Sequence, residues 1–345
     1  MTSPTLAPPQ SFDDIRALLS KLPPPAEDCA AAAHARQAEL TKPAGSLGRL
    51  EEIVEFLAAW QGRAMPSLAR ARVLVFAGNH GVVERGVSAY PASVTAAMAA
   101  NFAAGGAAIN QICATFNLDL NVVALDLDQP TLDFTEGAAM SETAAVASFA
   151  RGMAAVPDGA DLVAIGEMGI GNTTSAAAIY SALYDGKAGH WTGRGSGLDE
   201  PGLARKVAAI EAAVRLHRDK LGDPFEVLRR LGGYEIAAMA GAIVAARVKR
   251  APVLLDGYVA GAAAAILHAQ DPTVIAHCLA AHVAAEGAHA DVLQRLGKRP
   301  LLDLDMRLGE ASGAALAAGL VKAALACHRD MATFAEASVA GKLES

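Results

Sequence analysis

The chain of 345 residues is long enough for one large domain or two smaller ones, and its 53% of hydrophobic residues supplies a sizeable core. Aromatic residues make up only 5% of the chain, so we expect small aliphatic side chains in close helix packing to fill the interior. The net charge of −7 argues against a nucleic-acid-binding surface, which needs clustered Lys and Arg side chains.

The N-terminal segment predicts three helices and no strand. They cover Phe12 to Leu22, Ala26 to Leu40 and about Leu47 to Trp60. A Pro-Gly bend precedes the third helix, and Ser46 is expected to cap it. Because these helices come before any strand, they predict a helical appendage.

No charged residue occurs between Arg85 and Asp119, a length that would also suit a membrane span. Tyr90, Asn101 and Gly105 are among the residues that interrupt the apolar sequence. Two buried helices in the core of a soluble protein explain this segment better than a membrane span.

Six short apolar runs predict strands. They are residues 73–76, 121–126, 162–165, 252–257, a part of 274–282, and 301–304. Helical patterns alternate with them, which predicts an α/β fold with a right-handed, mainly parallel sheet and helices on both faces. In such folds ligand sites form beyond the carboxyl ends of the strands.

The strand at 162–165 leads into the glycine-rich segment Gly166–Gly171 and then into an Ala-rich helix. The glycines let backbone amides approach a ligand, and Thr173 is expected to cap the helix. Free amides and the helix dipole hold a phosphate without a metal, so this segment predicts a phosphate site. Glu167 would then contact a ribose hydroxyl or orient a cation. The alternative is a glycine-rich turn that binds no ligand.

Two further charged residues are candidates for the site. Lys206 lies in the second turn of a helix predicted from Pro201 to about Leu221, where it can reach an anion. The alternative is a lysine on the solvated surface. Asp256 ends a later strand and so lies at the same edge as Glu167.

Glu310 stands between a glycine and a helix that is expected to begin near Ser312. A carboxylate at the edge of a pocket suits a general base. The alternative is a glutamate at a helix start that the helix dipole stabilises.

His282, Glu286 and His289 are spaced so that one helical face would align them as metal ligands. Gly287 can break that helix, and no H-E-x-x-H motif supports the site. We therefore expect no metal.

The four cysteines are far apart and form no C-x-x-C pair. They are Cys29, Cys113, Cys278 and Cys327. Residues Met1–Thr5 lack the basic and apolar regions of a signal peptide. Free thiols and a cytoplasmic location are expected.

Six runs in family order, which together cover nearly the whole chain, carry a resemblance to a known family. They are Lys42–Glu51, Asn79–Val82, Gly166–Thr174, Gly193–Gly197, Pro252–Gly257 and Met306–Glu310. The chain resembles the nicotinate-nucleotide:dimethylbenzimidazole phosphoribosyltransferases, glycosyltransferases of nucleotide loop assembly in cobalamin biosynthesis.

The resemblance implies a Rossmann-like, six-stranded catalytic domain over 66–325 and a small helical domain from 1–65 and 326–345. It also implies a homodimer in which the partner helps to close each site. Nicotinate mononucleotide and dimethylbenzimidazole would be the substrates, with no cofactor, nucleic acid or membrane involved.

The resemblance also implies roles for single residues. Glu310 matches the family's catalytic base, while Glu167 and Lys206 match acidic and basic active-site residues. Residues that match the substrate-binding positions are Tyr90, Pro91, Met98, Gly169, Gly171, Asn172, Thr173, Gly195 and Leu308. Two positions depart from the family pattern, since Asn79 replaces an aspartate and Ala284 replaces a serine that can contact the phosphate.

The implied reaction transfers the 5-phosphoribosyl group of nicotinate mononucleotide to dimethylbenzimidazole, with inversion at C1′. Two alternatives are a related transferase that uses a purine or a phenol and a non-catalytic nucleotide-binding protein. A nicotinamide-dependent oxidoreductase fits less well, because the spacing of Gly166, Gly169 and Gly171 is not G-x-G-x-x-G.

Overall fold

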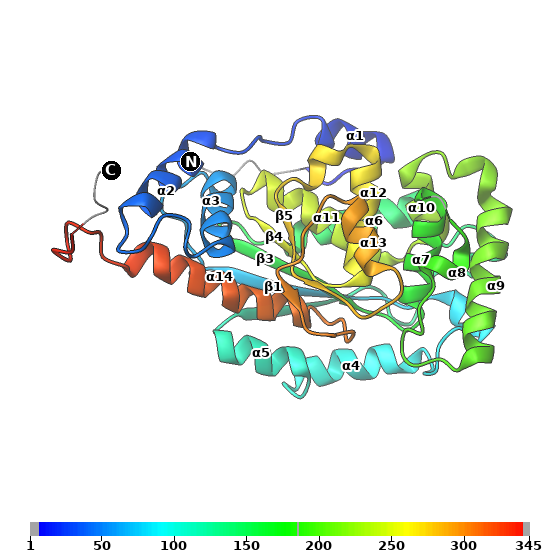
Figure 1. Ribbon diagram of the computed structural model, residues 1–345. Helices are drawn as coiled ribbons and strands as arrows, with labels where there is room; N and C mark the ends of the chain where they lie inside the picture. The colour runs from blue at the N-terminus through cyan, green and yellow to red at the C-terminus, as the bar shows by residue number, and fades with distance from the viewer. Residues whose placement is uncertain (1–6, 185, 341–345) are drawn as a thin grey trace.

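The computed structural model describes residues 7–184 and 186–340 (Figure 1), so the ends of the predicted terminal segments lie outside the described residues. Five parallel strands form the central sheet in the order β2-β1-β3-β4-β5. They are β1 (Ala71–Ala77), β2 (Asp119–Ala124), β3 (Leu162–Met168), β4 (Val253–Leu255) and β5 (Cys278–Ala280). The chain places β2 on one side of β1 and β3 on the other. The strand order therefore reverses at β1 and β3, where α/β folds form ligand sites.

The predicted six-stranded sheet is wrong by one strand. The run at 301–304 forms β7 (Leu302–Asp303), which pairs with β6 (His282–Val283) in a separate two-stranded sheet. Leu301 N and Leu302 N donate to the carbonyls of Ala280 and Ala281 at 3.0 Å. The sixth run thus lies beside the end of β5, the last strand of the main sheet. It is too short and too exposed to form a further strand of that sheet.

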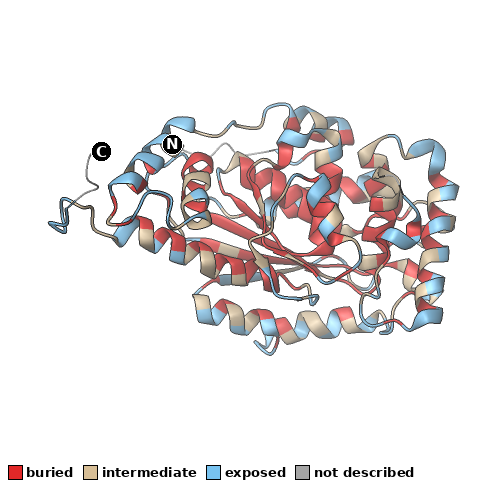
Figure 2. Cartoon of the chain, in the orientation of Figure 1, coloured by how far each residue is buried: buried red, intermediate tan, exposed pale blue. Residues whose placement is uncertain are grey.

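Side chains of the central strands alternate between two cores, as period-two geometry requires. Leu74 and Phe76 belong to one core, and Val73 and Val75 belong to the other. The first core is covered by α6 (Glu142–Ala155), α7 (Asn172–Leu183), α11 (Tyr234–Val248) and α12 (Tyr258–Gln270). The second is covered by α3 (Arg49–Gln61), α5 (Ala108–Phe116) and α14 (Ser312–Asp330). Helices on both faces of a parallel sheet confirm the predicted α/β class, and Figure 2 shows both cores in red.

The uncharged segment forms α4 (Ser93–Ala103) and α5, which lie along the lower edge of Figure 1. Their buried side chains are Thr95, Phe102, Ile109 and Cys113. The prediction of two buried helices is therefore wrong, because the remaining residues of both helices are intermediate or exposed (Figure 2). Within the described residues no helix is long and apolar enough to cross a membrane.

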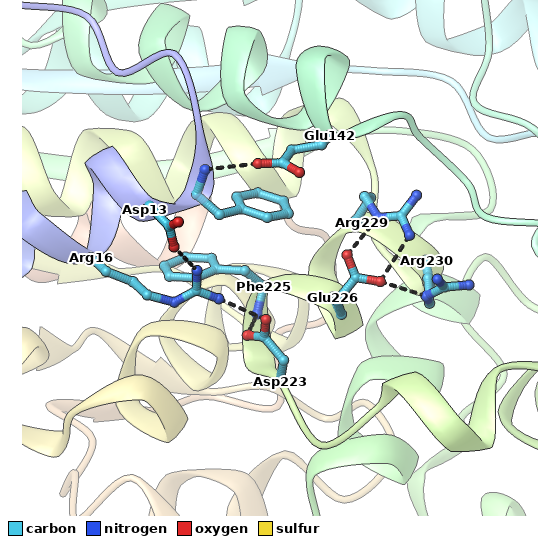
Figure 3. A network of polar contacts seen from close by, with 9 residues as sticks. Asp13, Arg16, Glu142, Asp223, Phe225, Glu226, Arg229 and Arg230 are labelled. Atoms are coloured by element: carbon cyan, nitrogen blue, oxygen red, sulfur yellow. Dashed lines mark hydrogen bonds and ion pairs between the residues drawn. The ribbon is translucent and has the colours of Figure 1, made fainter.

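The N-terminal helices pack at two different places. α1 (Phe12–Leu19) lies on α10 (Pro224–Leu231), where the Arg16 guanidinium contacts Asp223 at 2.6 Å (Figure 3). α2 (Glu27–Glu39) instead lies beside the end of α14, where Arg36 Nε donates to the carbonyl of His328 at 2.9 Å. α14 runs without a break through residue 325, where the family resemblance implies a domain boundary.

The predicted cap of α3 is wrong. Gly48 is the N-cap residue, with a positive φ of 53°, a conformation that favours glycine over serine. The Glu51 carboxylate accepts from Leu47 N at 2.9 Å and pairs with Lys42 Nζ at 2.8 Å. The remaining elements are α8 (Ala188–Trp191), α9 (Glu200–His217), α13 (His289–Arg295) and three short 3-10 helices at Gly81–Arg85, Arg218–Lys220 and Pro272–Ile275.

Candidate active site

A cleft of about 540 Å³ opens beyond the carboxyl ends of β3 and β4. Ten of the twelve residues predicted to be catalytic or substrate-binding line it: Tyr90, Met98, Glu167, Gly169, Gly171, Asn172, Thr173, Gly195, Leu308 and Glu310. Two others do not. Pro91 lies on the exposed turn before α4, and Lys206 lies behind the cleft wall with an exposed fraction of 0%. Strand order and the loops that follow the strands therefore gather distant sequence segments at one place.

The glycines of the predicted phosphate segment pack closely against neighbouring residues. A Cβ atom on Gly169 would lie 2.6 Å from the carbonyl oxygen of Gly78. Gly171 has a φ of +90°, and a Cβ atom there would lie 2.6 Å from Val83 Cγ2. Small residues at these positions are thus required for the chain to fold around the cleft, as well as for backbone access to a ligand.

Two long helices begin at the cleft. α7 begins at Asn172 after the N-cap Gly171, and α12 begins at Tyr258 after the N-cap Gly257. Gly171, Asn172, Gly257 and Tyr258 all line the cleft. Backbone N–H groups and the positive ends of two helix dipoles therefore favour an anion here. Sequence reasoning placed Asp256 at this edge but missed the start of α12, although the strand-Asp-Gly pattern marks it.

Thr173 does not cap α7, contrary to the prediction. It is the second residue of the helix, and its hydroxyl accepts from Lys206 Nζ at 2.8 Å. Lys206 Nζ also donates to the carbonyl of Gly193 at 3.1 Å. The alternative of a solvated surface lysine is therefore wrong: Lys206 is a buried cation that joins α7, α9 and the Gly193 loop.

Burial lowers the pKa of Lys206 to about 8, and the charge of Glu286 opposes this shift. The Glu286 carboxylate also accepts from Gly195 N at 2.8 Å, so it anchors the glycine loop at the cleft. At neutral pH Lys206 is still mainly protonated. A positive charge thus lies beneath Thr173, one residue layer from the cleft.

Two cleft carboxyl groups hold their protons unusually tightly. Burial raises the pKa of Glu167 to about 8, with further contributions from the charges of Asp256 and Glu235, while a hydrogen bond from Asn172 acts in the opposite direction. Burial raises the pKa of Glu310 to about 7, and the charge of Asp256 adds to it. Near neutral pH, Glu167 is mostly protonated and Glu310 is about half ionised. Glu310 is therefore the better proton acceptor of the two.

Apolar side chains also line the cleft, and they are named here the apolar wall. Tyr90 and Leu308 are 52% and 54% exposed, and Val94, Met98 and Ile170 line the cleft with them. Large apolar side chains with this exposure are suited to contact a ligand or another protein surface. The apolar character of this wall suits contact with an apolar ring.

The proposed helical alignment of His282, Glu286 and His289 is wrong. His282 lies in β6, Glu286 follows in a loop, and α13 begins only at His289. His289 Nδ1 accepts from Ala284 N at 2.8 Å. The described residues contain no group of three or more His, Cys, Asp and Glu side chains that could hold a metal ion.

The two departures from the family pattern lie in different settings. Asn79 is 5% exposed, and its side-chain amide donates to the carbonyl of Leu127 at 2.7 Å. This hydrogen bond joins the loop after β1 to the segment that follows β2. Ala284 lines the cleft, so the absence of a hydroxyl there affects the cleft directly.

Comparisons with known proteins agree with this geometry. A family model described as phosphoribosyltransferase matches residues 22–339. A nicotinate-nucleotide–dimethylbenzimidazole phosphoribosyltransferase of Methylocella silvestris is 65% identical over 98% of this chain and 99% of its own length. A protein of the same name from Rhizobium etli is 60% identical over 96% of this chain and 98% of its own length.

A solved structure also resembles the chain. The crystal structure of CobT from Thermus thermophilus is 40% identical, with a TM-score of 0.83 over 91% of this chain and 99% of that chain. Both sequence and fold therefore match one family over nearly their full lengths.

Proposed function

The chain belongs to the nicotinate-nucleotide–dimethylbenzimidazole phosphoribosyltransferase family, and from this premise we propose that the cleft transfers the 5-phosphoribosyl group of nicotinate mononucleotide to 5,6-dimethylbenzimidazole. The products are α-ribazole 5′-phosphate and nicotinate. The observation that carries the proposal is a carboxyl group with a pKa of about 7, Glu310, in a cleft that apolar side chains and two helix N-termini also line.

The substrates explain why this chemistry suits the cleft. The pyridine nitrogen of nicotinate mononucleotide is cationic, so nicotinate leaves with a neutral ring nitrogen and needs no proton from a general acid. The incoming benzimidazole attacks C1′ with one ring nitrogen and must lose the proton from the other. Attack on the face opposite nicotinate inverts the anomer from β to α. The protein's main tasks are to hold the two rings in line and to accept one proton.

We assign proton acceptance to Glu310. Its pKa of about 7 leaves a useful fraction ionised at neutral pH, while the pKa of about 8 keeps most of Glu167 protonated. A protonated Glu167 can donate a hydrogen bond to a substrate oxygen. The two carboxyl groups thus take different roles because their environments differ.

The same geometry supports positions for the two substrates. The phosphate would lie against backbone amides of the Gly169 segment and the start of α12, with the Gly195 loop beside it and Lys206 supplying charge through Thr173. The benzimidazole would lie against Tyr90, Met98 and Leu308. Since Ala284 has no hydroxyl, phosphate binding relies more on backbone amides in this chain.

We also infer that two copies of the chain form a homodimer through α4 and α5. Both helices lack charged residues and expose apolar side chains, and α4 carries the cleft residues Val94 and Met98. A second copy seated there would cover this face and help to close the cleft.

An Ala100→Glu substitution on the exposed face of α4 should then give monomers in light scattering. Ala208→Glu on the exposed face of α9 should leave dimers. Dimers in both variants would place the interface elsewhere.

Three further expectations belong to the same proposal. The helical segments 1–65 and 326–345 would act with each other as a small domain, supported by contacts such as Arg36 with His328. Four free thiols suit a reducing cytoplasm. A net charge of −7 does not suit a nucleic-acid partner.

An assay with both substrates tests the function. The protein is incubated with nicotinate mononucleotide and dimethylbenzimidazole, and nicotinate and the α-ribotide are separated by chromatography. We expect equal amounts of both products. Nicotinate release that does not depend on the acceptor would indicate a hydrolase instead. Competing benzimidazoles, purines and phenols in the same assay would identify the preferred base.

A further inference from the structure

The catalytic carboxyl group is carried on an unfavourable backbone turn. Gly309, Glu310 and Ala311 have successive φ values of 80°, 63° and 60°. Glycine adopts this left-handed conformation easily, but Glu and Ala side chains crowd the backbone in it. Such a turn persists only where surrounding contacts hold it, and backbone strain of this kind is concentrated at functional sites.

Three groups of hydrogen bonds stabilise the turn and the helix start that follows it. Glu310 N donates to the carbonyl of Glu167 in β3 at 3.1 Å. Ser312 donates to the carbonyl of Gly309 twice, from its N at 3.0 Å and from its hydroxyl at 2.7 Å. The Asp256 carboxylate accepts from Ala314 N at 2.9 Å, which holds the first turn of α14. The turn is thus tied to β3 and to the end of β4.

The turn also lies unusually close to the backbone of β3. A Cβ atom on Gly166 would lie 2.2 Å from the backbone N of Ala311 and 2.5 Å from its Cα. These atoms belong to the main chain, so no side-chain rotation can make room. Gly166 lies inside a buried strand and pairs with Val75, a setting in which glycine is otherwise unfavourable.

We propose that Gly166 is a positioning residue for the catalytic carboxyl group: its lack of a side chain lets the Gly309–Ala311 turn lie against β3, and this contact presents Glu310 to the cleft. The inference rests on the proposed function, in which Glu310 accepts the proton. Gly166 itself is outside the cleft lining and acts through Ala311 and Glu310.

The groups around Glu310 determine its pKa, so the pH dependence of kcat can report a displacement of Glu310. The charged and titratable groups on the packed elements are Glu167 in β3, Asp256 after β4 and His282 in β6, with Arg307 on the preceding segment. Arg307 Nη1 donates to the carbonyl of Gly195 at 3.3 Å. If the turn moves away from β3, Glu310 gains water and leaves Asp256, so its pKa falls towards the ordinary range. The fall of kcat on the acidic side of its pH profile, the acid limb, then moves to lower pH.

The experiment compares Gly166→Ala with Gly241→Ala in the full-length protein. A Cβ atom on Gly241 would lie 1.9 Å from the carbonyl oxygen of Phe149, so this control makes a backbone clash between α6 and α11 that is at least as close. For Gly166→Ala we expect kcat to fall by ~10–100-fold, because small misplacements of a reacting group have effects of that size. KM for nicotinate mononucleotide should change little, and the acid limb should shift. Gly241→Ala should lower the melting temperature without moving the limb.

Ser312→Ala provides a second variant should Gly166→Ala fail to fold. It removes one hydrogen bond to Gly309 without a clash, so it should lower kcat a few-fold and shift the acid limb in the same direction. Unchanged kcat and pH dependence in the folded Gly166→Ala, or in Ser312→Ala if the first variant does not fold, would overturn the inference. A wild-type protein that transfers no phosphoribosyl group would instead overturn the proposed function.

Discussion

The cleft and the contact between α1 and α10 both gather carboxyl groups, yet the two regions give them opposite properties. In the network of Figure 3, the carboxylate of Glu226 on α10 contacts two arginines of the same helix, Arg229 Nη2 at 2.8 Å and Arg230 Nε at 2.7 Å. These hydrogen bonds lower the pKa of Glu226 to about 2, against a smaller opposing effect of burial. In the cleft, burial and the charge of Asp256 raise the pKa values of Glu167 and Glu310 to about 8 and about 7.

This difference in pKa separates carboxyl groups that stabilise the fold from carboxyl groups that can exchange a proton during catalysis. A carboxylate matched by two guanidinium groups lowers the free energy of the folded state and has no reason to take up a proton at neutral pH. A buried carboxyl group beside another acid makes the fold less stable when it ionises. It also has a pKa near the working pH, which a general base needs.

The largest expected effect is on Glu310. Glu310→Gln keeps the size and a polar end but cannot accept a proton. We expect kcat to fall by ~10²–10⁴-fold, about 3–5.5 kcal/mol of transition-state stabilisation, with little change in KM for nicotinate mononucleotide. Initial rates of nicotinate release measure both constants.

The matched control for that substitution comes from the other region. Glu226→Gln removes a carboxylate that pairs with two arginines within α10 and should leave kcat near the wild-type value. If Glu310→Gln stays active while Glu167→Gln is inactive, the proton acceptor is Glu167, and the assignment based on pKa is wrong.

An intermediate effect is expected from the buried cation of the cleft. Lys206→Met removes a charge that acts on the cleft across Thr173, so KM for nicotinate mononucleotide should rise by ~10–100-fold, as expected for a buried charge that attracts an anion across one residue. Lys220→Met on the exposed surface is the control and should leave KM unchanged. A loss of kcat at unchanged KM would instead place Lys206 at the reacting centre.

The smallest expected effect is on stability, with opposite pH dependence in the two regions. The folded pKa of Glu167, about 8, lies above the ordinary 4.5, so its ionisation destabilises the fold increasingly as pH rises through that interval. The folded pKa of Glu226, about 2, lies below 4.5, so its stabilising contribution is present above 4.5 and is lost as pH falls towards 2.

Melting curves of two variants, measured at several pH values, test these opposite pH dependences of stability. Glu167→Gln should be more stable than the wild type by on the order of 1–2 kcal/mol at alkaline pH, with the difference vanishing in mild acid. Glu226→Gln should be less stable at neutral pH, with the difference shrinking in stronger acid. Parallel pH dependence in both variants would contradict the contrast between the two regions.

Several local features could be predicted from the sequence because they depend on neighbouring residues. Apolar runs located β1, β2, β3 and β4, and the glycine-flanked carboxylate before Ser312 located the start of α14. The motif residues around Glu167, Gly195 and Glu310 lie together in the cleft. Two cap predictions failed because the local pattern allowed more than one N-cap residue. Ser46 and Thr173 have hydroxyl groups that can cap a helix, but the helices begin after Gly48 and Gly171 instead.

By itself the sequence determined the order and type of the main elements, the residues at the strand edge and the family, since periodicity and motifs are local properties of the chain. Only the tertiary structure decided that Lys206 is buried, that Gly166 touches the Glu310 turn, and that Glu167 and Glu310 bind protons near neutral pH. The physical reason is that burial and charge interactions depend on all atoms within several ångströms. Those atoms come from strands and helices that lie far apart in the sequence.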